Sequence, residues 1–175
     1  MNTRILVILS LFVAIGAALH FVIPGIFGGM KPDMMLAMMF LGIALFPDKK
    51  NVLLIGLATG LLAGLTSSFP GGLIPNLIDK PVTAFVFFGL YLLIAKNMSN
   101  LVVVAILTAI GTLVSGTVFL GSALLIVGLP PGTGFLALFA AVVIPATILN
   151  AIAMFVLFPI AKTILKRTNL MQQAS

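Results

Sequence analysis

The sequence contains no cysteine, only three acidic residues and a single histidine, and only 7% of its 175 residues are charged. The absence of cysteine excludes a disulfide framework and thiolate chemistry. Three acids and one histidine leave little for an acid–base enzyme or a metal site, and the chain has no Walker loop and no Gly-x-Ser-x-Gly elbow. We therefore expect neither an enzyme nor a bound metal or cofactor.

Hydrophobic residues make up 62% of the chain, and its 7% of charged residues falls far below the roughly 25% of soluble globular domains. This composition predicts an integral membrane protein whose surroundings are the lipid bilayer, folded as one domain over residues 1–175. The formal net charge of +6 is compatible with a nucleic-acid partner. However, the basic residues stand at the ends of apolar runs, which indicates membrane orientation, so no nucleic acid is expected.

Six apolar segments predict an all-α membrane protein, a six-transmembrane-helix bundle. A spanning helix needs about 20 residues, so the short second segment is expected to begin deep in the membrane, and the long last two to tilt or protrude. The first segment resembles a signal peptide only loosely, and we expect a retained helix. Two prolines should kink or end the sixth helix locally. The segments are residues 5–23, 34–46, 52–69, 77 or 81 to 95, 101–128 and 135–165, and the prolines are Pro145 and Pro159.

The basic residues predict that both termini are cytoplasmic. With the N-terminus inside, seven basic residues fall on the inner side and only two, Lys31 and Lys80, on the outer side, which is a strong positive-inside bias. The outer loops are then residues 24–33, 70–80 and 129–134, all rich in glycine and proline. The second lies within the breaker-rich stretch 67–81. The inner basic residues are Arg4, Lys49, Lys50, Lys96, Lys162, Lys166 and Arg167.

The first two outer loops carry charged residues beside their prolines and glycines. Prolines and glycines break helices and leave backbone N–H and C=O groups without partners, so protein groups or water in a cavity must form hydrogen bonds with them. Lys31, Asp33, Asp79 and Lys80 are therefore expected to meet at one outer mouth, where they could pair with both charges of a zwitterionic amino acid. Alternatively, Asp33 caps the second helix, Asp79 caps the fourth, and the lysines pair with them or extend to the interface.

Uncharged candidates for this site lie near the same loops or within the sixth segment. Asn76 could bind a ligand or cap a helix, and Asn150 must find a partner within the bundle, most simply as a contact between helices. His20 could reach the mouth or serve as an interfacial residue. Phe69 and Met34 belong to an aromatic and methionine wall suited to an aromatic ligand, or to ordinary packing. The other members of this wall are Phe21, Phe27, Phe85, Phe88, Met30 and Met38.

Small residues recur at four-residue spacing on two of the expected helices. Gly56, Gly60 and Gly64 form one stripe, which we expect to be an internal packing surface. Ala14 and Ala18 form another on the first helix, and we expect this stripe to face a partner protein.

Several strings of the sequence resemble the bacterial tryptophan-transport S components, the substrate-binding subunits of energy-coupling factor transporters. The similarity covers most of the chain, and Gly-Gly-Met-Lys-Pro-Asp and Pro-Asn-x-x-Asp-Lys-Pro are its specific part. The strings are His20, the run from Gly28 to Met35, Phe46-Pro47, and the run from Ile74 to Val82, together with the alanine stripe.

The resemblance implies a subunit of the bacterial cell membrane that binds tryptophan from outside. It would dock through Ala14 and Ala18 on a membrane coupling component, and two cytoplasmic ATPase subunits would drive delivery inward. Alternatives are a self-sufficient secondary transporter of an aromatic amino acid, an S component for another small molecule such as a vitamin, an intramembrane enzyme and a structural membrane protein. The near absence of acids in the apolar runs disfavours an ion-coupled transporter.

Overall fold

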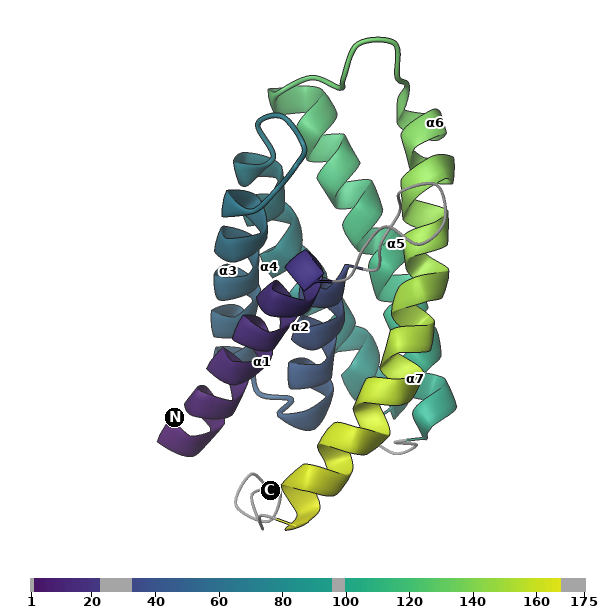
Figure 1. Ribbon diagram of the computed structural model, residues 1–175. Helices are drawn as coiled ribbons and strands as arrows, with labels where there is room; N and C mark the ends of the chain where they lie inside the picture. Colours follow the sequence, from purple (N-terminus) through teal and green to yellow (C-terminus); the bar gives the residue numbers. More distant parts are fainter. Residues whose placement is uncertain (1, 23–32, 96–99, 168–175) are drawn as a thin grey trace.

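The structure is a computed structural model that describes residues 2–22, 33–95 and 100–167. Within these ranges all regular structure is helical (Figure 1). The helices are α1 (Thr3–Val22), α2 (Met34–Leu45), α3 (Lys49–Leu65), α4 (Leu73–Leu90) with the π-helical turn η1 (Tyr91–Ala95), α5 (Leu101–Ile126), and α6 (Phe135–Leu138), η2 (Phe139–Val143) and α7 (Ile144–Arg167), which run on as one helix.

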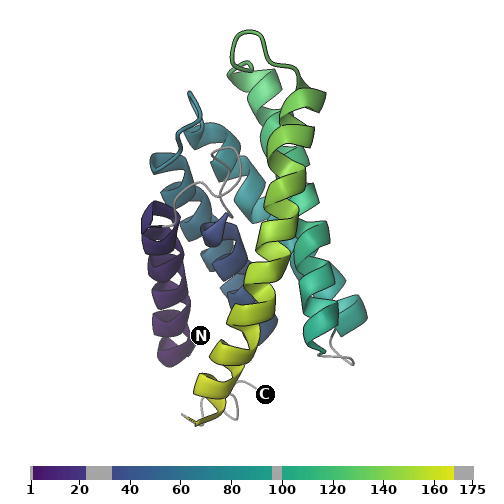
Figure 2. The same cartoon turned by 45° about the vertical axis from the view of Figure 1, so that its right-hand side comes forward.

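The helices run back and forth along one direction, so that α1 begins and α7 ends at the same end of the molecule (Figure 1). In the part of the chain that the structure describes, four helical stretches are long and apolar enough to cross a membrane: Thr3–Val22, Leu73–Ile94, Leu101–Ile126 and Phe135–Arg167. Helices α3 and α4, α4 and α5, and α5 and α7 pack as neighbours (Figure 2). The all-helical membrane class predicted from the sequence is therefore confirmed.

Helix α2 forms the centre of the bundle, and each of its residues is buried. It contacts α1, α3, α4, α5 and α7. Its 12 residues give a helix of about 18 Å, well below the roughly 30 Å of a hydrocarbon core. The core includes a close ring stack between Phe40 of α2 and Phe87 of α4, whose centroids lie 4.2 Å apart. A short helix enclosed on all sides brings its own N-terminus into the interior of the protein.

The expectation of a loop over residues 70–80 is wrong for most of that range, because α4 already begins at Leu73. Pro75 lies in the first turn of α4, where backbone N–H groups have no acceptor within the helix, so proline is tolerated there. Pro81 stands inside the helix, which continues through it. Asn76, Asp79 and Lys80 are therefore helical residues, and the density of prolines and glycines does not mark a loop here.

The two prolines of the last helix do not end it either. Pro159 lies inside α7, and Pro145 is the second residue of α7, two residues after the end of the π-helical turn η2. A proline cannot donate a backbone hydrogen bond to the preceding turn, and its ring crowds the carbonyl oxygen of that turn. The wider π turn therefore lies where the regular hydrogen-bond pattern of the α-helix would be interrupted.

The glycine stripe of α3 is internal, as expected, and brings α3 against the first turns of α4. A Cβ atom added at Gly60 would lie 3.0 Å from the Asn76 carbonyl oxygen, and one at Gly64 would lie 2.9 Å from Leu73 Cα. Contacts this short with backbone atoms leave no room for a side chain. The stripe therefore fixes the position of the segment of α4 that carries Asn76, Asp79 and Lys80.

We predict that Gly64→Ala lowers the thermal stability of the purified protein. Overpacking against a backbone typically costs about 1–3 kcal/mol, more than the roughly 0.5–1 kcal/mol that alanine gains over glycine in a helix. Gly89→Ala is the matched control, because a Cβ atom there would meet nothing within 4 Å. Melting temperatures in detergent that fall equally for both variants would contradict this account of the α3–α4 contact.

Candidate functional site

Helix α4 turns its polar side chains inward and its apolar side chains outward. Its buried positions include Asn76, Asp79, Lys80 and Thr83, which follow the three- and four-residue spacing of one helix face. The opposite face exposes apolar side chains. A charge within the hydrocarbon region is costly unless it is paired inside the protein, so this arrangement marks a functional or tightly paired polar site. The exposed apolar residues are Leu77, Ile78, Val82 and Phe85.

The centre of this site is the Lys80 ammonium group, which is shared between two carboxylates. Its Nζ lies 3.0 Å from Asp33 Oδ2 and 2.9 Å from Asp79 Oδ2, and donates to Ser115 Oγ of α5 at 3.3 Å. An ammonium group has three N–H donors, so these three partners use its full capacity. We call Asp33, Asp79, Lys80, Thr83 and Ser115 the charge cluster.

The two carboxylates of the charge cluster differ in their surroundings. Asp79 is 0% exposed, and besides the lysine it accepts hydrogen bonds from Thr83 Oγ1 at 2.8 Å and Ser115 Oγ at 2.7 Å. The Asp33 side chain is 30% exposed and caps α2 by accepting from the Leu36 backbone N–H at 3.0 Å. Asp33 is therefore the accessible carboxylate of the cluster.

The ionised form of Asp33 is favoured overall by its neighbours. Burial by itself disfavours this form, but the Lys80 charge, the Leu36 N–H and the nearby His20 outweigh it, so the pKa of Asp33 lies below its ordinary value. The cluster therefore brings two carboxyl groups to one ammonium group. Lys31, the fourth charged candidate, lies outside the described residues.

Two of the sequence-based interpretations of these charges need correction. Asp79 does not cap α4, because it lies well inside a helix that begins at Leu73. Lys80 does not stand at an open outer mouth but is 3% exposed, enclosed between α4, α5 and the start of α2. The alternative in which Asp33 caps the second helix is confirmed, and this carboxylate also pairs with Lys80.

A second polar group lies between α5 and α7. Thr112 Oγ1 donates to the Thr108 carbonyl oxygen at 2.8 Å, and Asn150 Nδ2 donates to Thr112 Oγ1 at 3.2 Å. All three side chains are buried. Asn150 therefore does connect two helices through its amide nitrogen. Thr112 stands one helical turn from Ser115, which places this group next to the charge cluster along α5.

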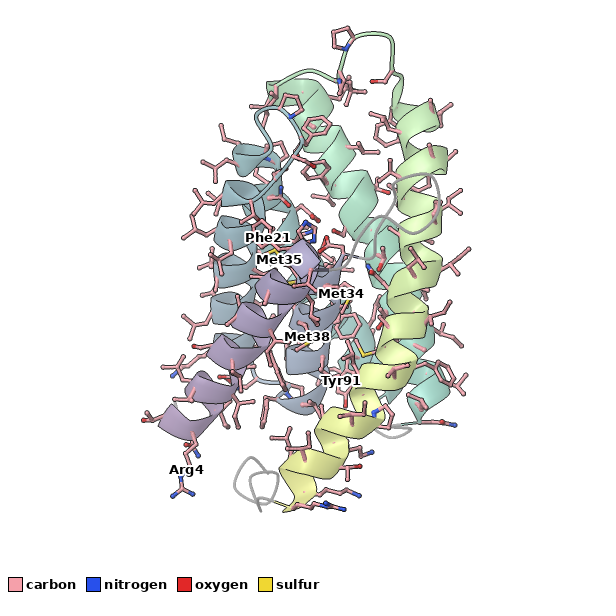
Figure 3. The ribbon with its side chains drawn as sticks, viewed as in Figure 1. Arg4, Phe21, Met34, Met35, Met38 and Tyr91 are labelled. Atoms are coloured by element: carbon pink, nitrogen blue, oxygen red, sulfur yellow. The ribbon has the colours of Figure 1, made fainter. Side chains whose placement is uncertain are left out.

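The other candidates lie at the edges of this region. Asn76 is buried one turn before Lys80, and its Nδ2 donates to the Gly72 carbonyl oxygen at 2.8 Å. Met34 is buried at the start of α2 and is labelled in Figure 3. Phe69 packs edge-to-face on Phe119 of α5, with ring centroids 5.3 Å apart.

The expected aromatic wall is only partly present. Phe21, which is labelled in Figure 3, is 68% exposed and Phe85 is 42% exposed, so neither lies in the packed interior. Met38 and Phe88 are buried, whereas Phe27 and Met30 lie outside the described residues. The interior aromatic rings instead include Phe40, Phe87 and Tyr91. The sequence signal for Phe87 was the same helix face that carries Asp79, Lys80 and Thr83.

Thr83, Ser115 and Thr112 are functional candidates that were not expected from the sequence. Each stands at helical spacing from other buried polar or small residues, Thr83 with Asp79 and Ser115 with Thr112, and this periodicity could have identified them. Within the described ranges, no three His, Cys, Asp or Glu side chains come together as metal ligands.

On α1, Ala14 and Ala18 are exposed, whereas the intervening Gly16 is buried. A Cβ atom added at Gly16 would lie 3.1 Å from Met35 Cα of α2. One face of α1 therefore packs closely on α2, and the two alanines lie on a face that the described residues leave uncovered.

Long apolar helices that enclose a buried cluster of charges define a polytopic α-helical membrane protein with a polar site in its interior. Comparison with known families specifies this class further. The family model described as tryptophan transporter TrpP matches residues 2–166, and the chain belongs to this family.

Curated relatives extend over almost the whole chain. It is 60% identical to a probable tryptophan transport protein of Bacillus subtilis, with 99% of each chain covered. It is 46% identical to one of Clostridium acetobutylicum, covering 93% of this chain and 94% of the relative, and 37% identical to one of Clostridium perfringens, covering 97% of each. No solved structure matches the chain. The family and the apolar helices identify a multi-pass protein of the bacterial cell membrane.

We predict that Lys80→Met destabilises the protein and that Lys80→Met combined with Asp79→Asn restores part of the loss. Removing one partner of a buried ion pair typically costs about 3–5 kcal/mol because the other charge stays buried without compensation. Melting temperatures without ligand test this, with Lys166→Met at the exposed end of α7 as the control. A double variant as unstable as Lys80→Met alone would contradict the pairing of Lys80 with Asp79.

Proposed function

We propose that this chain is the substrate-binding membrane subunit of a tryptophan uptake system whose ATPases are separate subunits. The observation that carries the proposal is the charge cluster, which brings two carboxyl groups to one ammonium group inside an apolar bundle. The relatives of the chain are named as probable tryptophan transport proteins, and the sequence contains no ATPase motif of its own.

The second carboxyl group of the cluster supports recognition of a substrate ammonium group. Asp33 is the partly exposed carboxylate, and one of its oxygens already receives Lys80 while the other receives the Leu36 N–H. Each carboxylate oxygen has a second lone pair, so an ammonium group can join without displacing either donor. Asp79, which is enclosed, serves to hold Lys80 in place.

The substrate carboxylate needs a different partner. Lys80 already donates to Asp33, Asp79 and Ser115, so binding a fourth acceptor would break one of these contacts. Lys31, which lies near Asp33 in sequence, is the cation we assign to the substrate carboxylate. The ring of tryptophan would then lie deeper, between α2, α5 and α7, beside Met34.

The membrane topology belongs to the same proposal. The ends of α1, α3 and α7 that lie together in Figure 1 carry most of the inner basic residues, whereas Lys80 belongs to the first half of α4, which begins at the opposite end. These basic residues are Arg4, Lys49, Lys50, Lys162, Lys166 and Arg167. The positive-inside rule then places both termini in the cytoplasm, with six spans and the enclosed charge cluster nearer the outer side. Ala14 and Ala18 would form the docking face for a membrane coupling component, as in energy-coupling factor transporters.

We predict that Asp33→Asn weakens tryptophan binding by about tenfold to a thousandfold. Loss of a desolvated charge contact costs about 2–5 kcal/mol, and each 1.4 kcal/mol is about tenfold. Asparagine is as good a helix cap as aspartate, so α2 should stay capped. Asp48→Asn is the matched control, because Asp48 caps α3 from an exposed position. Isothermal titration of the purified protein gives the affinities.

Ligand analogues separate the two charged contacts. Indole-3-propionate lacks the ammonium group, and it should bind the native protein more weakly than tryptophan but lose little further affinity in Asp33→Asn. Tryptamine lacks the carboxylate and should remain sensitive to Asp33→Asn. If all ligands bind Asp33→Asn as they bind the native protein, Asp33 serves only as a cap. A titration of every amino acid against the native chain tests the choice of tryptophan.

We predict that Ala14→Leu and Ala18→Leu leave tryptophan binding intact and abolish ATP-dependent uptake, because bulky side chains block close approach of a partner helix. Uptake in cells and binding to the purified chain are measured in parallel. Gly89→Leu adds comparable bulk on α4 at a position without near neighbours. Uptake by the chain alone in vesicles with an ion gradient would instead support a secondary transporter and overturn the role of separate ATPases.

A further inference from the structure

Asn150 combines complete burial with an unused acceptor. It lies near the middle of the continuous helix Phe135–Arg167 and is 0% exposed, and its Oδ1 has no hydrogen-bond partner among the residues that the structure describes. Buried polar atoms are nearly always satisfied, so an unpaired carbonyl oxygen in a membrane bundle indicates a missing partner. A role as a contact between helices explains the amide nitrogen of Asn150 but not this oxygen.

The hydrogen bonds around Asn150 determine which end of its amide is free. Thr112 has one hydroxyl hydrogen, and it donates this hydrogen to the Thr108 carbonyl oxygen at 2.8 Å. The Thr112 oxygen can then only accept, so it must face the Asn150 NH2 group, as it does at 3.2 Å. The free group is therefore the oxygen, and only a ligand group that donates a hydrogen bond can satisfy it.

This acceptor lies next to the charge cluster. Thr112 and Ser115 are three residues apart on the buried face of α5, a rise of about 4.5 Å along the helix. Ser115 contacts both Asp79 and Lys80. Thr112 is closer than Ser115 to the start of α5, the end at which α1 begins and α7 ends (Figure 1). A ligand whose ammonium group meets Asp33 would therefore point its ring from the cluster toward Asn150.

We propose that Asn150 Oδ1 accepts the indole N–H of tryptophan and so selects for an aromatic amino acid with a ring donor. This inference rests on the proposed function. Thr112 and Thr108 act as positioning residues, since they hold the amide in the orientation that presents the oxygen. Phenylalanine, which has no ring donor, would leave the buried oxygen unpaired, and a site built for a hydrogen bond discriminates strongly against such a ligand.

The test compares tryptophan with 3-benzothienylalanine, in which sulfur replaces the indole N–H and the ring shape is nearly unchanged. The native protein should bind tryptophan about tenfold to a hundredfold more tightly, as expected for one buried hydrogen bond. Asn150→Leu should bring the ratio of the two dissociation constants close to one, mainly by weakening tryptophan. Thr112→Val keeps the shape of the side chain but removes the acceptor of the Asn150 amide, which is then free to rotate. This variant should therefore partly reduce the ratio of the two dissociation constants.

Thr117→Val is the matched control, because Thr117 lies on the exposed side of α5 and bonds only the carbonyl of its own helix. Its ratio should equal the native ratio. If the native protein binds tryptophan and 3-benzothienylalanine equally, the inference is overturned without any variant. The inference therefore stays testable even if Asn150→Leu does not fold. A native-like ratio in folded Asn150→Leu overturns it as well. Tryptophan binding without discrimination refutes only the role of Asn150, whereas no tryptophan binding at all refutes the proposed function.

Discussion

The arrangement of the bundle depends on neutralising the Lys80 ammonium group within an apolar interior. Desolvation of a single ammonium group costs several kcal/mol, so its partners must be placed with good geometry. Asp79 alone is adjacent in sequence, but Asp33 and Ser115 come from α2 and α5 and reach Lys80 only if those helices pack on the same face of α4. The pairing therefore ties three helices together at one point.

Other features of the fold follow from this constraint. The glycine stripe of α3 lets the first turns of α4 approach closely, which leaves the polar face of α4 directed at α2 and α5. The shortness of α2 allows Asp33, its capping residue, to enter the interior instead of ending at the membrane surface. The same carboxylate thus caps a helix, neutralises a lysine and provides the accessible charge on which the proposed recognition of an ammonium group depends.

Most of the helices and part of the site could be predicted from the sequence, because long apolar runs and charged ends reflect the thickness of the bilayer directly. A loop was predicted over residues 73–80 because prolines are frequent there, but the position of each proline in the helix matters more than their number. Pro75 occupies a first turn, where proline is tolerated, and Pro81 is carried by a helix held between neighbours. The inward spacing of Asn76, Asp79 and Thr83 was the stronger signal, since a helix face that collects polar residues in an apolar chain must be buried.

The sequence by itself determined the membrane class, the approximate helices and the residue types available for a polar site, since these depend on local composition and periodicity. Only the tertiary structure decided that Lys80 joins Asp33 to Asp79, that Phe40 stacks on Phe87, and that Thr112 orients the Asn150 amide. Helical periodicity fixes which residues share a face, but which faces meet depends on how closely distant helices can pack, and that is a property of the whole bundle.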